Sequence, residues 1–517
     1  MPIESIQPLL AFLASLAGAA LIVAFRDRPN LREACSLAAS VLQFVAVLSM
    51  VPAVLAGQTL HHTLFSFLPQ VAIAFRVDGL GLLFAATASS LWILTTIYSI
   101  GYMRALGEQR QTRFYAFVAL ALSATMGLAF AANLVTFYIF YEALTFITYA
   151  LVTHHATDEA AAAGRKYLAY HLGTSIAFML PAIIWTYTIS GTFAFQPDGV
   201  LSIATAGTTT LTIIYLLFLG GIGKAAIIPF HAWLPTAMVA PVPVSALLHA
   251  VAVVNAGVFC AFRVILNVFG EDLMRDLNLG TPTVAIASVT ILLASFYAFR
   301  LDNLKALLAY STIAQLSYMI MGAGLLHPRG MTGGVMHLAV HSFSKITLFF
   351  CVGSIYLALR KTKISEMHGV GPRLPWTMAA FLIGALSIIG LPPTAGFLTK
   401  WYLATGALDS GQLPVFFVLL VSTLLSAVYY LRIVATAFFV APEPHGEEHR
   451  EEDRPSVEKL LESAEEAAED ASAGADSVRA RRLAALTLVP AVVTAAIVLA
   501  LGIFPGLLLR LVAQVFR

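Results

Sequence analysis

The chain has 517 residues, of which 59% are hydrophobic and only 11% are charged, and its formal net charge is +2. A soluble globule of this composition would expose too much apolar surface, so we expect an integral membrane protein in contact with the lipid bilayer. The nearly neutral charge, without a basic patch carrying interleaved aromatic residues, excludes a nucleic-acid partner.

Hydrophobic runs long enough to span a core of about 30 Å follow one another along the chain. They lie near residues 6–25, 34–55, 78–100, 114–131, 134–153, 165–190, 209–235, 242–266, 281–299, 304–325, 333–358, 377–407, 414–440 and 483–514. This pattern predicts an all-α integral membrane protein with about 14 transmembrane helices. We expect no strands, because the runs lack the period-two alternation of membrane-spanning strands. The first run has no cleavage signal, so we expect it to be retained.

Lys and Arg are divided unevenly between the predicted loops. With the N-terminus outside, twenty of them fall in inner loops, against four in outer segments: Arg76, Arg275, Arg329 and Arg517. The positive-inside rule therefore places both termini outside a cell inner (cytoplasmic) membrane. A missed span would exchange the sides of every later loop, so the bias also supports the number of spans.

The sequence offers no redox chemistry of its own. Cys35, Cys260 and Cys351 lie inside apolar runs and are expected to be reduced, without a metal or a disulfide. There is no nucleotide-binding glycine loop and no haem motif, so we expect no cofactor. The chain would be a translocase only as part of a redox-driven complex, and its status as an enzyme stays open.

Residues 220–255 are the stretch around which the chain is organised. Lys224 follows a glycine cluster inside an apolar run, and Pro229 and Pro235 interrupt the backbone after it. Irregular backbone and a charge at membrane depth are tolerated only where protein or water surrounds them. This stretch therefore predicts an ion pathway.

Six basic residues fall within predicted spans. For Arg263, Arg432 and Arg510, which lie toward the ends of their spans, we expect side chains that reach out to the interface. The other three, Lys224, Lys345 and Lys400, lie well inside apolar runs and are expected to be functional, although Lys345 could equally tie helices together.

Glu142 is the single acid of its span and the expected partner of Lys224. The pair is either a static ion pair or one that makes and breaks as Lys224 takes up and releases a proton. Histidines supply intermediate groups, because imidazole can pass a proton between its two nitrogens. His337, His341 and Lys345 recur every four residues and so line one helix face. The predicted proton relay comprises Glu142, Lys224, His249, Asn255, His337, His341, Lys345 and Lys400, and no metal site.

The seventh and twelfth spans resemble each other. Lys224 is followed by Pro229, and Lys400 is preceded by Pro392-Pro393. The two spans are an odd number apart, so they cross in opposite senses, as in transporters built from inverted repeats. We predict two inverted five-helix repeats with broken helices 7, 8 and 12. The expected units are 1–113 (helices 1–3), 114–266 (first repeat), 267–440 (second repeat), 441–482 (acidic cytoplasmic segment) and 483–517 (helix 14).

Segment 441–482 holds thirteen of the 28 acidic residues. Ser456 is a candidate cap for a helix that Gly474 would end. We interpret the segment as a solvated loop or as a docking element for a neighbouring subunit. Neither His445 nor His449 makes a convincing metal site.

The chain resembles the antiporter-like subunits shared by Mrp-type multisubunit cation/proton antiporters, respiratory complex I and membrane-bound hydrogenases. The matching words are Arg76-Val77-Asp78-Gly79-Leu80, Tyr141-Glu142, Gly223-Lys224, Pro229-Phe230-His231-Ala232-Trp233-Leu234-Pro235, Ala240 to Ala250, Leu304 to Thr312, and Gly390-Leu391-Pro392-Pro393 to Lys400. The resemblance covers most of residues 70–440. It implies that Glu142 and Lys224 form the couple where protons enter, and that His249 and Lys400 belong to the lateral relay and its far end.

Two departures from that family matter. Thr236-Ala237-Met238 stands where members commonly read Asp-Ala-His, and Asn255 stands where many have Lys. The length resembles that of the D subunit of the Mrp type. The resemblance implies a proton-translocating subunit of a Na⁺ or K⁺/proton antiporter that works with other membrane subunits. A proton-pumping subunit of a complex I-type oxidoreductase or hydrogenase, and a scaffold that does not conduct, remain alternatives.

Overall fold

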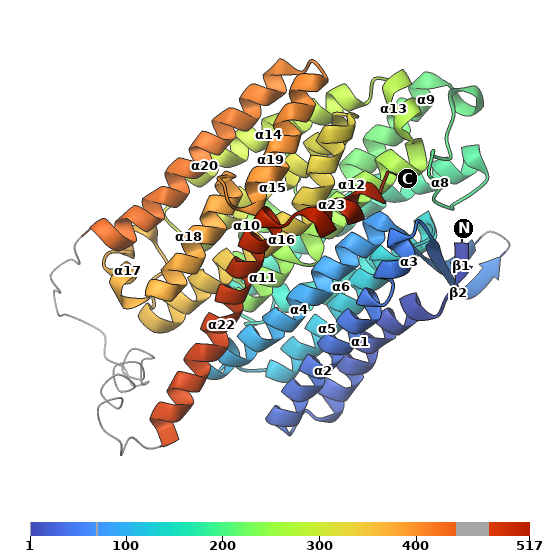
Figure 1. The fold of residues 1–517 in the computed structure, drawn as a ribbon. Coiled ribbons are helices and arrows are strands. Elements are labelled where there is room, and N and C mark those ends of the chain that lie inside the picture. The colour runs from blue at the N-terminus through green and yellow to red at the C-terminus, as the bar shows by residue number, and fades with distance from the viewer. Residues whose placement is uncertain (1, 69–70, 441–474, 517) are drawn as a thin grey trace.

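The computed structural model describes residues 2–68, 71–440 and 475–516 and shows an elongated bundle of helices with a small sheet at one end (Figure 1). Among these residues, 13 helical segments are long and apolar enough to cross a membrane. The predicted twelfth span adds a further crossing, made of two shorter helices, α18 (Pro375–Ile389) and α19 (Ala395–Asp409). The prediction of an all-α membrane protein with about 14 spans is confirmed.

The remaining helices follow the predicted runs closely. The first half contains α1 (Gln7–Ala24), α2 (Pro29–Leu48), α3 (Val51–Leu55), α4 (Gly79–Ala105), α5 (Gln111–Ala129), α6 (Leu134–Val152), α7 (Asp158–Thr174), η1 (Ser175–Met179), α8 (Leu180–Ser190), α9 (Ile203–Gly221), η2 (Gly223–Ala225), α10 (Trp233–Thr236), η3 (Ala237–Val239), α11 (Val242–Ala250), α12 (Val253–Arg263) and η4 (Val264–Phe269). The second half contains α13 (Glu271–Asp276), α14 (Gly280–Arg300), α15 (Leu304–Gly324), α16 (Pro328–Leu359), η5 (Ile364–Glu366), α17 (Val370–Arg373), α20 (Leu413–Phe439), α22 (Ala475–Ile503) and α23 (Gly506–Ala513).

A three-stranded sheet, which we did not expect, pairs the N-terminal residues with the segment between the second and third spans. β1 (Pro2–Glu4) pairs in parallel with β2 (Thr59–Leu68), and β2 pairs antiparallel with β3 (Val71–Val77). The strands are short and stand outside the long apolar runs, so a search for spans passes over them. β3 leads directly into Asp78, which caps α4 by accepting a hydrogen bond from the Gly81 amide at 2.9 Å.

Three spans are broken, as predicted. The seventh run stops being helical at Gly221, although we expected it to continue to residue 235. α11 and α12 are separated at Val251 and Ala252, and α18 and α19 are separated by residues 390–394. Glycine or proline stands at the first and third breaks, where Gly390 has φ of +90°, a conformation that side chains rarely adopt, whereas the break at Val251 and Ala252 contains neither. Each break exposes backbone groups and brings them next to one of the predicted relay residues.

Both termini lie at the end of the bundle that carries the sheet (Figure 1). β1 is paired there with β2, and Gln514 packs against Gly79 at the start of α4. The predicted last run, 483–514, is in fact two helices, of which α22 crosses the bundle against α4, α16 and α18 and α23 turns back over α4. Because both termini lie at the same end, the chain traverses the bundle an even number of times.

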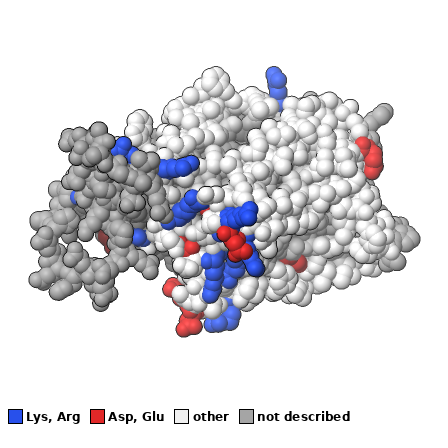
Figure 2. Space-filling model, turned by 90° about the horizontal axis from the view of Figure 1, so that it is seen from below, with Lys and Arg blue, Asp and Glu red and all other residues white. Residues whose placement is uncertain are grey.

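The opposite end of the bundle carries most of the described basic side chains. Seen from that side, Lys and Arg gather in one part of the face, and much of the rest is uncharged (Figure 2). Some of them are tied down: Arg104 donates to Glu33 at 3.0 Å, and Arg113 donates to the His154 carbonyl at 2.7 Å. The predictions for His445, His449 and the helix from Ser456 to Gly474 concern residues outside the described part of the chain. The unit boundaries stay a prediction.

Candidate functional site: a row of buried lysines and histidines

Lys224 lies in the break after α9, and its side chain is fully buried. Its ammonium donates to Thr145 Oγ1 at 2.5 Å and lies 3.4 Å from the ring centre of Tyr141, both on α6. Gly257 of α12 packs against the backbone of Lys224 and Ala225 with no room for a side chain. The lysine is therefore fixed between two helices, with a hydroxyl and an aromatic face as its partners.

Glu142 stands beside these groups on α6 but does not form the predicted closed pair. It is an electrostatic neighbour of Lys224. Both of its carboxylate oxygens are nevertheless buried without a hydrogen-bond partner among the described residues. In this structure the couple is held apart, with Thr145 taking the ammonium. A buried carboxylate without a protein partner is costly unless water satisfies it.

His171 belongs to the same region and was missed by sequence analysis. It lies on α7, fully buried, with its ring centre 4.3 Å from that of Trp233 and 4.2 Å from that of Tyr167. It is an electrostatic neighbour of Lys224, and neither ring nitrogen has a hydrogen-bond partner in the described chain. The signal was present, because Tyr167, His171 and Thr174 follow helical spacing and form a polar stripe.

His249 and Asn255 flank the break between α11 and α12. The Asn255 amide donates to the Ala250 carbonyl at 2.9 Å and to Ser342 Oγ of α16 at 2.8 Å, so it closes the break and joins it to the next helix. His249 packs against Phe349, with ring centres 5.0 Å apart. Both nitrogens of His249 are buried and have no partner among the described residues. Asn255 thus links α11, α12 and α16 through its amide, whereas both ring nitrogens of His249 are left without a protein partner among the described residues.

The next predicted residues, His337 and His341, lie on α16. The rings of His341 and His337 are 6.0 Å apart, and His341 has neither nitrogen bonded within the described chain. His337 is hydrogen-bonded through Nδ1 to Thr399 Oγ1 and through Nε2 to Gln315 Oε1, each at 2.8 Å. All of these groups are buried. The predicted face is therefore a real one, and it ends next to α19.

Lys345, on the same face, has two fixed partners. It donates to the Leu308 carbonyl of α15 at 3.1 Å and to the Tyr430 hydroxyl of α20 at 3.0 Å. Lys345 therefore ties α15, α16 and α20 together. Its buried amine also lies one turn from His341 on the same helix face.

Lys400 lies on α19 and reaches back to the break between α18 and α19, in a setting like that of Lys224. Its ammonium donates to the Ile389 carbonyl, at the end of α18, at 3.0 Å and to Thr423 Oγ1 at 3.1 Å. It lies 4.9 Å from the ring centre of Tyr318. Both lysines thus combine a broken helix, a threonine hydroxyl and a tyrosine face, and neither is directed toward lipid headgroups.

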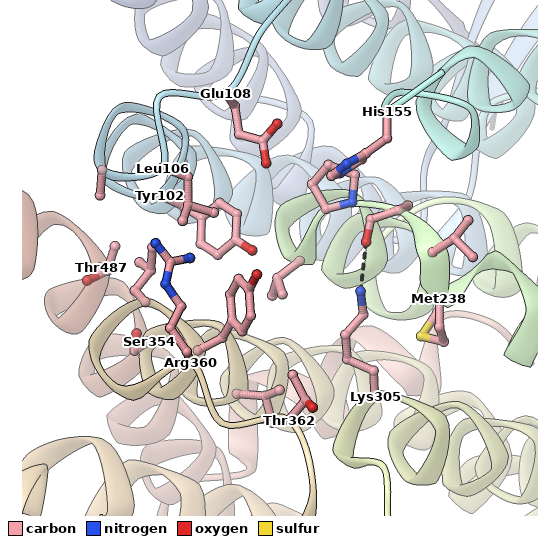
Figure 3. Close-up of a pocket in the computed structure, with 18 of the residues that line it drawn as sticks. Tyr102, Leu106, Glu108, His155, Met238, Lys305, Ser354, Arg360, Thr362 and Thr487 are labelled. Carbon is pink, nitrogen blue, oxygen red and sulfur yellow. Dashed lines mark hydrogen bonds between the residues drawn. The ribbon is translucent and has the colours of Figure 1, made fainter. Parts of the chain in front are cut away.

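A large cavity opens at the basic end of the bundle, and we call it the vestibule. Its volume is about 1650 Å³, and it is lined by the ends of α4, α7 and α16, by η3 and by α22. Glu108 and His155 lie on one side of it and Lys305 and Arg360 on the other (Figure 3). Lys305 donates to the Ala240 carbonyl at 2.8 Å, just before α11, and is an electrostatic neighbour of His249.

Arg263 corrects a prediction, because it does not reach out to the interface. It is buried, and its guanidinium binds Asp78 with two hydrogen bonds of 2.5 and 2.8 Å and Asn267 with one of 3.0 Å. Arg76 lies 3.6 Å from the same carboxylate. Asp78 is fixed as the cap of α4, so the pair locks the start of the third span to the end of the eighth. Nothing in the local sequence links residues so far apart.

The cysteines are free, with Cys260 and Cys351 buried and Cys35 partly buried. In the part of the chain that the structure describes, no three His, Cys, Asp or Glu side chains come together in a way that would hold a metal ion.

Comparisons with known proteins agree with this geometry. Residues 131–426 match the family described as NADH:quinone oxidoreductase/Mrp antiporter, TM, and residues 68–115 match NADH-ubiquinone oxidoreductase (complex I), chain 5 N-terminus. The chain is 28% identical over 396 residues to NADH-quinone oxidoreductase subunit N of Desulforudis audaxviator, covering 75% of this chain and 77% of that protein. It is 32% identical over 384 residues to subunit L of Escherichia coli, covering 72% of this chain but only 59% of that subunit.

Two solved structures have the same fold. A chain of the Mrp complex from Dietzia sp. DQ12-45-1b superimposes with a TM-score of 0.83 at 24% identity, covering 99% of this chain and 96% of that one. A chain of the membrane-bound sulfane sulfur reductase, an archaeal respiratory membrane complex, gives a TM-score of 0.81 at 22% identity, covering 99% and 97%. These relatives are subunits of multisubunit membrane complexes. With more than half of its length matched by the family pattern, the chain belongs to the NADH:quinone oxidoreductase/Mrp antiporter family of membrane subunits.

Proposed function

We propose that the chain is the proton-translocating subunit of a multisubunit Na⁺ or K⁺/proton antiporter. Protons move sideways at mid-depth along the predicted relay, from Glu142 and Lys224 past His249 and the face of α16 to Lys400. The observation that carries the proposal is the shared setting of these groups. Two amines are buried at broken helices, the imidazoles of His249, His337 and His341 are buried as well, and no charged side chain among them is neutralised by a closed ion pair among the described residues.

The hydrogen-bonding state of the histidines supports transport over a static core. His249 and His341 together leave four buried ring nitrogens without protein partners in the described chain. Such groups are expensive unless water satisfies them. Water next to imidazole provides a proton path, because each nitrogen alternates between donor and acceptor. His337, by contrast, is held at both nitrogens and orients the last step toward Thr399 and Lys400.

The proposal includes an orientation. The basic end lies inside, at the cytoplasmic face of the inner membrane, and both termini lie outside. The vestibule then opens to the cytoplasm and brings bulk water close to η3 and the start of α11. Lys224 serves the first half of the relay and Lys400 the second, and Arg263 with Asp78 closes the outer end.

Proton flux into vesicles that contain the assembled complex tests the proposal. Lys224→Ala and Glu142→Ala should each reduce cation-driven flux at least tenfold while the complex still assembles. Arg275→Ala is a matched control, because this substitution also removes a positive charge, but at an exposed position, and should leave flux unchanged. Unchanged flux in Lys224→Ala, with normal assembly, would leave only a scaffold role.

A redox-driven subunit is the second candidate, and the relatives named as quinone oxidoreductase subunits favour it. The relay would be the same, but energy would come from partner subunits. Adding Na⁺ or K⁺ to vesicles at a fixed pH gradient separates the two cases. An antiporter collapses the gradient when the cation is added, whereas a redox pump responds only to an electron donor such as NADH.

A further inference from the structure

A row of hydroxyl groups runs along one face of α20. Ser422, Ser426 and Tyr430 recur every four residues, and Tyr429 lies beside them. All four side chains are buried, although α20 exposes much of the rest of its surface. The spacing places these hydroxyls on one line that faces the interior of the bundle. The relay described above does not use them.

Hydrogen bonds connect this row to Lys345 without a gap at its first end. The Lys345 ammonium donates to the Tyr430 hydroxyl at 3.0 Å, and that hydroxyl is 2.9 Å from Ser311 Oγ of α15. Tyr429 donates to Ser311 at 3.2 Å and is 3.0 Å from Ser426 Oγ. Four consecutive hydrogen bonds thus lead away from Lys345.

The other end of the row reaches Lys400. Thr423 accepts a hydrogen bond from the Lys400 ammonium at 3.1 Å, and it lies on the turn of α20 that precedes Ser426. Side chains one turn apart on a helix are about 5–6 Å from each other, a distance that one water bridges. The Tyr318 hydroxyl lies at this step, buried beside the hydroxyls of Ser422 and Thr423.

We propose that this hydroxyl row is a second proton path between Lys345 and Lys400, parallel to the imidazole path through His341 and His337. The inference rests on the proposed function, because it assumes that protons move between these lysines. Each hydroxyl is both a donor and an acceptor, so it can take a proton on its oxygen while its own proton passes on. The Lys345 ammonium loses one proton, the Lys400 amine gains one, and rotation of the hydroxyls restores the row.

A purely structural role makes a different forecast. If the hydroxyls only tie α15, α16 and α20 together, removing one lowers flux by the same factor whether or not the imidazole path is intact. If the two paths run in parallel, each hides the loss of the other. The interaction between two substitutions therefore separates the two roles.

The test measures proton flux of the assembled complex in vesicles for Tyr429→Phe, His337→Gln and the double variant. Tyr429→Phe interrupts the row between Ser311 and Ser426 but leaves the direct partner of Lys345 in place. We expect each single variant to lose about twofold and the double variant to lose at least tenfold. Tyr297→Phe, at an exposed position on α14, is the matched control and should retain full flux.

Three results would overturn the inference: a double variant no slower than His337→Gln alone, a double variant whose loss is only the product of the two single losses, or a Tyr429→Phe variant without any flux. Ser311→Ala combined with His337→Gln repeats the test if Tyr429→Phe disturbs assembly. Lys224→Ala is measured in the same series. If it keeps its flux, the proposed function itself fails; if it loses flux at least tenfold while the double variant loses no more than the product of the two single losses, only the parallel path fails.

Discussion

Replacing Gly257 by Ala should disable the first half of the relay while leaving every charged group in place. A methyl group at this position of α12 would meet the carbonyl carbon of Lys224 at 2.6 Å and the Ala225 Cα at 2.8 Å, and it would lie even closer to the Ala225 nitrogen. These are backbone atoms, so no side chain can rotate away. The break that carries Lys224 must move.

The size of the movement follows from the contacts. To reach the ordinary contact distance of 3.4 Å, the carbonyl carbon of Lys224 must retreat by about 0.8 Å. The Lys224 ammonium then loses its 2.5 Å hydrogen bond to Thr145 or its cation–π contact with the Tyr141 ring. Overpacking of this kind costs about 1–3 kcal/mol. Misplacement of a reacting group by about 1 Å lowers rates by up to about a hundredfold.

Proton flux in vesicles, measured together with thermal unfolding of the purified complex, checks this prediction. We expect flux to fall tenfold or more while the complex remains folded. Gly220→Ala is the matched control, because its methyl group would meet nothing closer than Phe178 at 3.6 Å, and it should keep normal flux. Normal flux in Gly257→Ala would refute the claim that the position of Lys224 limits transport.

Two further predictions concern the ends of the bundle. Arg263→Met should destabilise the protein by about 3 kcal/mol, since it removes two hydrogen bonds from the largely buried Asp78 carboxylate and leaves it with Arg76 at 3.6 Å. Arg275→Met, on an exposed pair, should change stability by less than about 1 kcal/mol. Thermal unfolding in detergent compares the two variants, and equal shifts would contradict the role given to Arg263. At the basic end, hydrogen bonds from Ser365 at 2.6 and 2.9 Å hold the pKa of Asp302 below its usual value. Because that folded-state pKa is lowered, the stabilisation is complete above the unfolded pKa of about 4 and is lost as pH falls through the folded value. The protection of the Ser365 amide against hydrogen exchange, relative to an unfolded chain at the same pH, should therefore fall below about pH 4 in the natural chain. Asp302→Asn should show no such step.

The sequence predicts the spans well because burial in lipid demands long apolar runs and leaves few alternatives. The breaks at Lys224 and Lys400 were visible for the same reason, since Gly, Pro and Lys are costly in a lipid-facing helix. The sheet of β1, β2 and β3 was not visible, because its strands lie outside the long apolar runs and β1 pairs with a strand far along the chain.

Partners of the relay residues were the part that sequence could not supply. Glu142, the single acid of its span, was predicted to pair with Lys224. The Lys224 ammonium instead donates a hydrogen bond to Thr145, three residues further along the same helix. Arg263 was predicted to reach the membrane interface because it lies near a helix end. It is buried instead, and its guanidinium donates hydrogen bonds to Asp78, which is distant in sequence. His171 and the hydroxyls of α20 were passed over because single polar residues in apolar helices usually have a structural role. Their burial without partners, or in a chain of hydrogen bonds, becomes apparent only once the helices are packed.

The central claim is that a proton travels sideways in sequence, from Lys224 to Lys400. Charge movement after a pH jump tests it most directly, recorded from the assembled complex on a solid-supported membrane with the natural chain, Lys224→Ala and Lys400→Ala. The relay predicts a transient followed by a sustained current in the natural chain, a transient alone in Lys400→Ala, and neither in Lys224→Ala. A transient that survives in Lys224→Ala, or a sustained current in Lys400→Ala, would contradict it.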